Sequence, residues 1–415
     1  MARSAPPATS WLDSASAGEG VVPMYQPVVA LDGQRTVGFE ALARWPDVDA
    51  PPPMVFAHAG ARGTLDILDH RCISAAVAGA LRDELRRDSV LLVNCEPNSG
   101  YVGPGDDDLI ARGRDRFRMV FEFTERGLLT HPRELLRKLA AVRADGFAVA
   151  LDDVGADPDS LALLDVVCPD IIKLDLAMVQ SNPTREQART LSAVLAHHER
   201  TGVVILAEGI ENDEHLERAL AVGATLGQGF LFGQAASLRG DGEAVSWSKT
   251  FEHKDIGVES RSPFDIVART CPVRTARKSA LMAFSHHLES QALHAADPPM
   301  VMTALQRACY FTRDTRHRYR KLAARLPLVA VFGEEVPDEL GPGVRGVALD
   351  PSDPLCLEWT VLMLGPHAAG ALVAREHDDH RVTGTPDGER RFDVAITHDR
   401  ALVTRCARSL LERMR

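Results

Sequence analysis

The chain has 415 residues, of which 45% are hydrophobic and 25% are charged, and its formal net charge is −11 at pH 7. These values exclude a collagen-like or largely disordered chain, and the length predicts two domains. No apolar run is long enough for a membrane helix, so no membrane span is expected. The seven cysteines lie apart without a CxxC pair, which predicts a cytoplasmic location and neither a disulfide framework nor a zinc site.

The acidic charge is concentrated in the first part of the chain. Lys and Arg number 24 against 36 Asp and Glu over residues 1–250, and 23 against 22 over residues 251–415. The first part therefore carries −12 and the second +1. An acidic domain without a Lys/Arg stripe repels nucleic acid, so no nucleic-acid partner is expected.

Residues 1–20 lack the layout of a signal peptide and are expected to form a disordered leader. Over residues 21–240, short apolar runs typical of strands alternate with stretches of helical periodicity. The runs are Met24–Val29, Thr36–Ala41, Val90–Asn94, Met119–Phe123, Ala148–Leu151, Ile171–Leu174, Val203–Ala207 and Ala224–Leu226. About eight such repeats predict an α/β fold with a parallel sheet closed into a (β/α)8 TIM-like barrel.

Residues 241–262 lie in a polar stretch without an apolar period and are expected to form a linker. Residues 263–415 predict a smaller α+β domain. Helices are expected at Phe264–Ala295, Met300–Leu326 and Thr397–Arg413. Strands are expected at Leu328–Phe332, Val344–Leu349, Glu358–Leu364 and Ala368–Ala374.

Polar side chains stand at or near the carboxyl ends of the predicted barrel strands. They are Glu40, Asn94, Glu122, Asp152, Asp153, Lys173, Glu208 and Gln228. Because these strand ends meet at one mouth of a barrel, we expect the side chains to face a common point. Clusters of oxygen ligands bind hard cations such as Mg²⁺ or Mn²⁺. The adjacent Asp152 and Asp153 can bridge two cations, an arrangement that suits in-line displacement at a phosphodiester.

Each of these residues alone has a simpler interpretation. A single acid at a strand end is more often a helix cap or a solvated loop residue, and Asp152 with Asp153 can cap the next helix. Lys173 alone can be a solvated surface lysine. The occurrence of so many polar residues at successive strand ends favours the metal site.

Seven segments follow, in order, the motifs of one family. They are GFEALAR (38–44), LLVNCEP (91–97), VFEFTER (120–126), ALDDVGA (150–156), PDIIKLD (169–175), LAEGIEN (206–212) and LGQGFLFG (226–233). Through them, the chain from residue 21 to about residue 236 resembles the EAL domain family. The resemblance implies a homodimeric barrel enzyme that hydrolyses cyclic di-GMP to linear pGpG with two Mg²⁺ or Mn²⁺ ions per active site.

The resemblance also implies a role for each matching residue. Metal ligation is implied for Glu40, Asn94, Glu122, Asp152, Asp153 and Glu208. Catalytic roles are implied for Lys173, Glu208, Glu125 and Gln228. Substrate contacts are implied for Arg44, Glu40, Leu42, Gln228 and Glu211. In this set Lys173 holds or polarises the attacking water, and Arg44 pairs with a substrate phosphate.

The chain departs from the family after the paired aspartates. Val154–Pro158 reads Val-Gly-Ala-Asp-Pro where the family has Phe-Gly-Thr-Gly, so Asp157 replaces a glycine and a rigid proline follows. Leu176 replaces an arginine, which removes one possible phosphate contact. These changes leave open an alternative, a cyclic di-GMP receptor or scaffold that binds without turnover. A different metal-dependent barrel hydrolase is a third interpretation.

Segments of the C-terminal half resemble the DICT family of sensory domains. They are SPFDIVA (262–268), SHHLE (285–289), LEWTVLML (357–364) and RRFDVAITHD (390–399). The resemblance implies a regulatory domain whose ligand is unknown, and we expect it to act on the loop Val154–Pro158. Alternatively, a flexible linker leaves the two domains independent. His286 and His287 point about 100° apart on a helix and are expected to be solvated.

Overall fold

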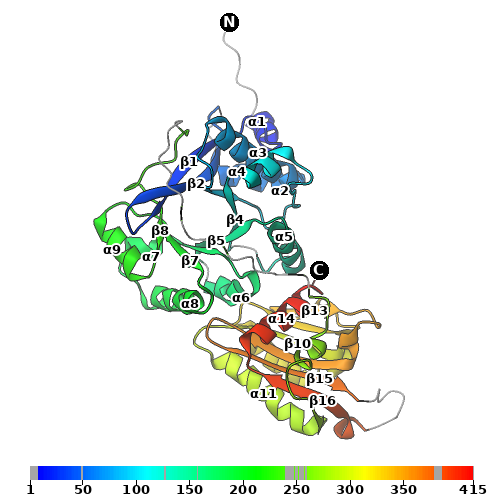
Figure 1. Ribbon diagram of the computed structural model, residues 1–415. Coiled ribbons are helices and arrows are strands. Elements are labelled where there is room, and N and C mark those ends of the chain that lie inside the picture. The colour runs from blue at the N-terminus through cyan, green and yellow to red at the C-terminus, as the bar shows by residue number, and fades with distance from the viewer. Residues whose placement is uncertain are drawn as a thin grey trace.

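The computed structural model describes residues 8–47, 50–125, 128–156, 158–238, 247, 251, 257, 259–377 and 386–414. The chain forms a closed eight-stranded barrel followed by a second domain built on one eight-stranded sheet (Figure 1). This confirms the expected order of a TIM-like barrel and a smaller α+β domain. Among the described residues, no helix has the length and apolar character of a membrane span.

The barrel strands follow one another in sequence order. They are β1 Val22–Ala30, β2 Arg35–Arg44, β3 Val90–Asn94, β4 Arg118–Thr124, β5 Ala148–Val154, β6 Ile171–Leu174, β7 Val204–Ala207 and β8 Leu226–Gly227. Strands β2 to β8 are parallel, whereas β1 runs antiparallel to both β2 and β8. The expectation of a fully parallel sheet is therefore wrong for β1. A short turn joins β1 to β2, and only antiparallel neighbours can be joined without a crossover.

Alternate strand residues divide between the inside of the barrel and the layer under the helices. On β3, Val90 and Leu92 belong to the interior cluster, and Leu91 and Val93 pack under the helices. The surrounding helical segments are α2 Pro52–Arg62, α3 Leu65–Arg82, α4 Asp108–Arg116, α5 Pro132–Ala144, η1 Pro158–Leu163, α6 Leu164–Val167, α7 Ala177–Gln180, α8 Arg185–Thr201 and α9 Asp213–Ala221. The filled interior leaves the carboxyl ends of the strands as the place for a site.

Helix α1 (Ala8–Ser16) lies within the expected leader. Ala15 is buried in a cluster with Trp45, Val55 and Leu68, and Trp11 and Leu12 pack against it. The prediction of a disordered leader is therefore wrong for residues 8–20, because an apolar side of α1 covers α2 and α3. Residues 1–7 lie outside the described part of the chain.

Most of the expected linker also lies outside the described residues, but two aromatic residues in this region contact the barrel. Trp247 and Phe251 pack against the interior cluster, with their ring centres 5.7 Å apart. Arg118, the first residue of β4, donates a hydrogen bond to the carbonyl oxygen of Trp247 at 2.8 Å. The connection is thus attached at the amino ends of the barrel strands, opposite the candidate site.

The C-terminal sheet has the strand order β12-β13-β11-β10-β14-β15-β16-β9. Its strands are β9 Arg274–Arg277, β10 Met300–Arg307, β11 Val329–Glu334, β12 Glu339–Gly341, β13 Val344–Ala348, β14 Glu358–Leu364, β15 Ala369–Glu376 and β16 Arg391–Thr397. Its helical segments are α10 Pro263–Val267, α11 Lys278–His294, η2 Ala308–Tyr310, α12 Arg313–Ala323, η3 Pro354–Leu357, η4 Asp387–Glu389 and α14 Arg400–Leu411. Side chains of one face pack with α10 and α14, and those of the other with α11 and α12.

Two of the helices expected in this half are wrong in part. Met300–Leu326 begins with strand β10, which lies between β11 and β14 and is buried on both faces. Such a strand has no apolar–polar alternation, so its sequence resembles a buried helix. Phe264–Ala295 is likewise interrupted, because α10 ends at Val267 and edge strand β9 precedes α11. Expected helix Thr397–Arg413 corresponds to α14, which begins three residues later.

Helix α14 lies between its own sheet and the barrel, whereas α11 lies on the far side of the sheet (Figure 1). The helix contacts β14 and β15 on one side and α5 and α6 on the other. Arg408 donates to the carbonyl oxygens of Asp165 at 3.0 Å and Val166 at 3.1 Å, at α6 of the barrel. Arg400 pairs with the Asp165 carboxylate. The two domains therefore share an interface centred on α6.

Candidate active site

Five charged side chains from five strand ends meet at the carboxyl mouth of the barrel. Lys173 of β6 is fully buried, and its Nζ lies 2.9 Å from Glu122 Oε1 of β4 and 2.9 Å from Asp152 Oδ1 of β5. The same Nζ lies 3.0 Å from Glu208 Oε1, directly after β7, and 3.3 Å from Glu40 Oε2 of β2. The convergence expected from barrel geometry is thus present, with the lysine among four carboxylates.

Two amide side chains hold Glu40 in this cluster. Asn94 Nδ2 at the end of β3 donates to Glu40 Oε1 at 3.2 Å. Gln228 Nε2, just after β8, donates to Glu40 Oε2 at 3.0 Å. Both carboxylate oxygens of Glu40 are therefore fixed in orientation by neighbouring strands.

Asp153 joins the cluster through an unusual backbone conformation. Its φ of 59° lies in the left-handed region, and the β5–β6 pairing is irregular between Leu151 and Val154. Carboxylate oxygens of Asp152, Asp153 and Glu208 lie within 4.8 Å of one another. The irregular end of β5 brings two consecutive acids to the same point, which a regular strand would send to opposite faces.

The crowding of charges shifts the pKa values of the cluster. Burial, together with the charge of Glu40, raises the pKa of Glu122 well above its usual range. Burial also raises the pKa of Glu208 to about 8, although Lys173 opposes the shift. Burial alone would lower the pKa of Lys173, but the Asp152 and Glu122 carboxylates outweigh it and raise that pKa. Lys173 therefore remains a cation, and the remaining negative charge is only partly compensated.

This set of donors fits divalent cations. Four carboxylates surround one ammonium group, and both Glu122 oxygens and Asp152 Oδ1 are buried without a well-aligned hydrogen bond, despite their proximity to Lys173. Hard oxygen ligands of this kind suit Mg²⁺ or Mn²⁺. A dication at Asp152, Asp153 and Glu208 would supply the missing positive charge.

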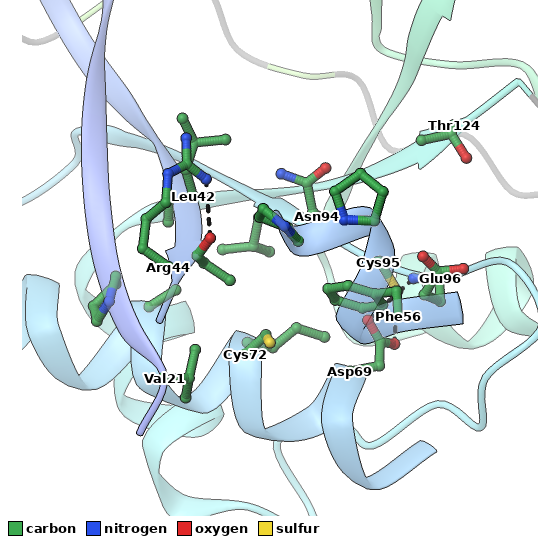
Figure 2. A pocket seen from close by; sticks show the side chains of 18 of the residues that line it. Val21, Leu42, Arg44, Phe56, Asp69, Cys72, Asn94, Cys95, Glu96 and Thr124 are labelled. Atoms are coloured by element: carbon green, nitrogen blue, oxygen red, sulfur yellow. Dashed lines mark hydrogen bonds between the residues drawn. The ribbon is translucent and has the colours of Figure 1, made fainter. Parts of the chain in front are cut away.

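A cavity of about 500 Å³ opens beside the cluster (Figure 2). Leu42 and Arg44 of β2 line one side, and Asn94 and Asp153 connect the cavity to the acidic cluster. Arg44 Nη1 donates to the carbonyl oxygen of Ala43 at 2.9 Å. The size is that of a small-molecule site, and Asp153 is the carboxylate of the cluster that lines it.

The structure also contains a buried polar group that the sequence patterns did not indicate. Lys138 Nζ of α5 lies 2.7 Å from Ser99 Oγ, 2.6 Å from the carbonyl oxygen of Glu96 and 3.5 Å from Asp69 Oδ2 of α3. Asp69 and Glu96 line the cavity. The signal available in the sequence was a lysine three residues after Leu135, on the apolar face of α5.

The two remaining predicted residues are placed differently. Glu125 is buried, and its Oε2 accepts a hydrogen bond from the amide of Gly155 at 3.4 Å, in the loop after the aspartates. Glu211 is exposed before α9, and within the described residues no hydrogen bond or ion pair joins its side chain to the cluster. Asp157 of the altered loop lies outside the described residues.

Comparisons with known proteins agree with this geometry. The curated protein cyclic di-GMP phosphodiesterase RocR of Pseudomonas aeruginosa is 32% identical over 217 residues, covering 50% of this chain and 55% of its own length. The probable cyclic di-GMP phosphodiesterase PdeG of Escherichia coli is 30% identical over 223 residues, covering 51% of this chain and 44% of its own. The chain thus spans about half the length of these curated relatives.

A similar solved structure is that of Klebsiella pneumoniae BlrP1 in a manganese and cyclic di-GMP complex. It is 29% identical, covers 53% of this chain and 57% of its own, and has a TM-score of 0.47. The model of the sensory domain in diguanylate cyclases and two-component systems, DICT, matches residues 267–377. The EAL domain model matches residues 9–235, more than half of the chain. The chain therefore belongs to the EAL domain family, with a DICT domain after the barrel.

Proposed function

We propose that the barrel hydrolyses cyclic di-GMP to linear pGpG with two bound divalent cations, Mg²⁺ or Mn²⁺. The observation that carries this proposal is the meeting of Glu40, Glu122, Asp152 and Glu208 around Lys173 beside an open cavity. The names of the phosphodiesterase relatives support the same substrate. When bound, the cations would stabilise negative charge on the phosphodiester oxygens.

In this reaction a water oxygen forms a bond to phosphorus, the bond from phosphorus to the 3′ oxygen breaks, and one proton reaches that oxygen. Lys173 remains protonated, so it positions the water and opposes negative charge instead of accepting a proton. Burial raises the pKa of Glu208 to about 8 in the metal-free site, so a cation bound there would displace a proton near neutral pH. Asn94 and Gln228 keep Glu40 oriented throughout.

The cavity supplies the binding surface for the substrate. Arg44 offers a guanidinium for a phosphate, a pairing that its planar donors suit. Glu96 and Asp69 line the same cavity, and carboxylates accept hydrogen bonds of the kind that a guanine edge donates.

Incubation with cyclic di-GMP and Mn²⁺, followed by chromatography, tests the proposal. Formation of pGpG that stops on chelation is the expected result. Binding without any pGpG would favour the second candidate function, a cyclic di-GMP receptor. The altered segment Val154–Pro158 is the observation that keeps this candidate in view, because it follows the metal-binding aspartates directly. Absence of both binding and turnover contradicts both candidates.

We further propose that the DICT domain regulates the barrel through helix α14. Strand β5 carries Asp152 and Asp153, and η1 and α6 follow it along the chain. Arg400 and Arg408 of α14 hold the carboxylate and carbonyl groups of Asp165 at the start of α6. A displacement of α14 would therefore act on the segment that continues from the aspartates.

A further inference from the structure

A second cavity, of about 540 Å³, lies in the C-terminal domain. Its lining comes from α11, from β10 and the start of α12, from β14, and from η4 and β16. These elements belong to the face of the sheet packed with α11, whereas the barrel contacts the face covered by α14. The cavity is therefore separate from the active site and has the size of a small-molecule site.

A buried polar network forms one side of this cavity. Arg390 is 2% exposed, and its guanidinium forms two hydrogen bonds with the Glu376 carboxylate at 2.8 and 2.7 Å. Gln306, which is 4% exposed, donates to Glu376 Oε2 at 3.0 Å and accepts a hydrogen bond from Arg390. These groups are preorganised by one another, as the polar groups of a binding site must be.

Gln306 also has a strained backbone. Its φ of 66° lies in the left-handed region, which a glutamine rarely adopts, and the β10–β11 pairing is irregular between Ala304 and Arg307. Backbone strain of this kind is concentrated at active sites and ligand sites. The strained residue lies at the polar side of the cavity, which favours a binding role over simple packing.

Aromatic side chains are concentrated around the same space. Tyr310, Trp359 and Phe392 are three of the 17 lining residues, although aromatic residues make up only 5% of the chain. The Arg390 guanidinium lies 4.7 Å from the centre of the Tyr310 ring and 5.1 Å from that of Phe392, which fixes both rings. Fixed aromatic faces select flat ligands by stacking.

The charges of the lining balance. Its three cations and three carboxylates are Lys278, Arg318, Arg390, Glu289, Asp314 and Asp387. Lys278 Nζ lies 2.5 Å from Asp387, and Arg318 Nε donates to Glu289 at 2.8 Å. Since Arg390 is held by Glu376, each cation already has a carboxylate partner, and an anionic ligand would have to displace one. We propose that this cavity binds a neutral, planar heteroaromatic molecule.

Isothermal titration of the full-length protein tests the proposal with three neutral probes of increasing ring number, nicotinamide, adenine and riboflavin. Nicotinate, which has the same ring but carries a negative charge, is the matched control for nicotinamide. At least one neutral probe should bind at one site per chain at concentrations up to about 1 mM, and nicotinate should bind at least about tenfold more weakly than nicotinamide if the latter binds. Failure of all three neutral probes, or equal binding of nicotinate and nicotinamide, overturns the proposal.

Two variants locate the binding. Met282→Trp on α11 places a bulky ring at the cavity, whereas Phe284→Trp changes another exposed apolar residue of α11 that does not line it. Met282→Trp should abolish binding and Phe284→Trp should preserve it. If thermal unfolding shows Met282→Trp to be misfolded, Cys309→Trp, at an exposed lining residue of η2, replaces it. Binding that survives the folded blocking variant lies elsewhere in the chain and contradicts the assignment.

Discussion

In the barrel mouth, individual side chains hold like charges close together in a buried space. Lys173 compensates only part of the negative charge of Glu40, Glu122, Asp152 and Glu208. Bringing like charges together in a buried space is costly unless a counter-charge is present. The arrangement is therefore most stable when further cations enter, which links metal binding to the stability of the fold.

Asp152→Asn should lower the hydrolysis rate about a hundredfold or more while the protein stays folded, because one charge shared by the proposed cations is lost. Calorimetric titration with Mn²⁺ should show fewer than the proposed two ions per chain. Asp115→Asn, at a surface residue whose side chain is 75% exposed, is the matched control and should change neither quantity. Unchanged Mn²⁺ stoichiometry in Asp152→Asn rules out the bridging role.

Lys173→Met should abolish hydrolysis and also destabilise the metal-free protein, by about 3–5 kcal/mol, since the ionised carboxylates around it would lose their buried counter-charge. The measurement is thermal unfolding with a chelator and with excess Mn²⁺. Mn²⁺ should raise the unfolding temperature of Lys173→Met more than that of the wild type. Equal shifts in the two proteins contradict the view that bound cations and Lys173 compensate the same charges.

The sequence predicted which residues lie at the site better than it predicted the contacts between them. Strand periodicity placed Glu40, Glu122 and Asp152 at strand ends, and barrel geometry then brings them together. It also placed Lys173 at this mouth together with the acids, where the structure has it. It did not reveal that Lys138 is buried beside the cavity, because that fact depends on distances between elements far apart in the chain, which local patterns do not contain.

At the scale of elements, strands buried on both faces were the hardest to recognise. Strand β10 was predicted as a helix because apolar residues on two faces remove the period of two. Strands β2 and β3 were recognised because they are short apolar runs that alternate with stretches of helical periodicity. The edge strand β9 was missed for the opposite reason, since its exposed Arg-Thr-Ala-Arg sequence carries almost no apolar signal.

The contact between α6 and α14 gives a prediction at this scale. Asp165 pairs with Arg400 and lies 3.4 Å from His197 and 3.6 Å from Arg200. Asp165→Asn should reduce the free energy of unfolding by about 1–3 kcal/mol, because it leaves partly buried cations without their partner. Chemical denaturation at pH 7 measures this loss. Asp213→Asn, at an exposed acid in the first turn of α9, should have no comparable effect.

The same variant has a defined pH dependence. Burial raises the pKa of Asp165, but His197 and Arg400 outweigh it, so the pKa of the folded state is lowered. A lowered pKa stabilises the fold above the pKa of the unfolded state, about 3.9, and this contribution disappears as the pH falls. The difference between wild type and Asp165→Asn should therefore shrink below about pH 4. A constant difference down to the acid transition would contradict the role of the charge.

At the scale of the whole molecule, the hydrophobic cluster under the barrel helices is continuous with the cluster under α14. Leu139 of α5 and Leu410 of α14 belong to the same buried set. Contact of this kind argues against independent domains, the alternative that the polar connection had suggested. Removal of the C-terminal domain would expose apolar surface of α5 and α6 to water.

Truncation after residue 257 retains Trp247 and Phe251 and removes only the C-terminal domain. It should lower the unfolding temperature and change the hydrolysis rate by about 5- to 150-fold, the usual range of coupling between sites. Mass in solution should be measured in parallel, because the full chain of 45.1 kDa is expected to be a homodimer. If rate and mass both stay unchanged, the C-terminal domain does not control catalysis. Truncation after residue 240 separates the contribution of the two aromatic residues.

The attachment of Trp247 and Phe251 to the amino end of the barrel limits how far the sensory domain can travel. Only seven residues separate Phe251 from Glu259, which is already bound to Arg405 of α14. A fully extended segment of that length spans less than about 30 Å. Because this tether is short, α14 that has left α6 remains near it, at an effective concentration of about the millimolar range. Under the proposed regulation, a signal that releases the barrel would have to outcompete this rebinding for as long as release lasts.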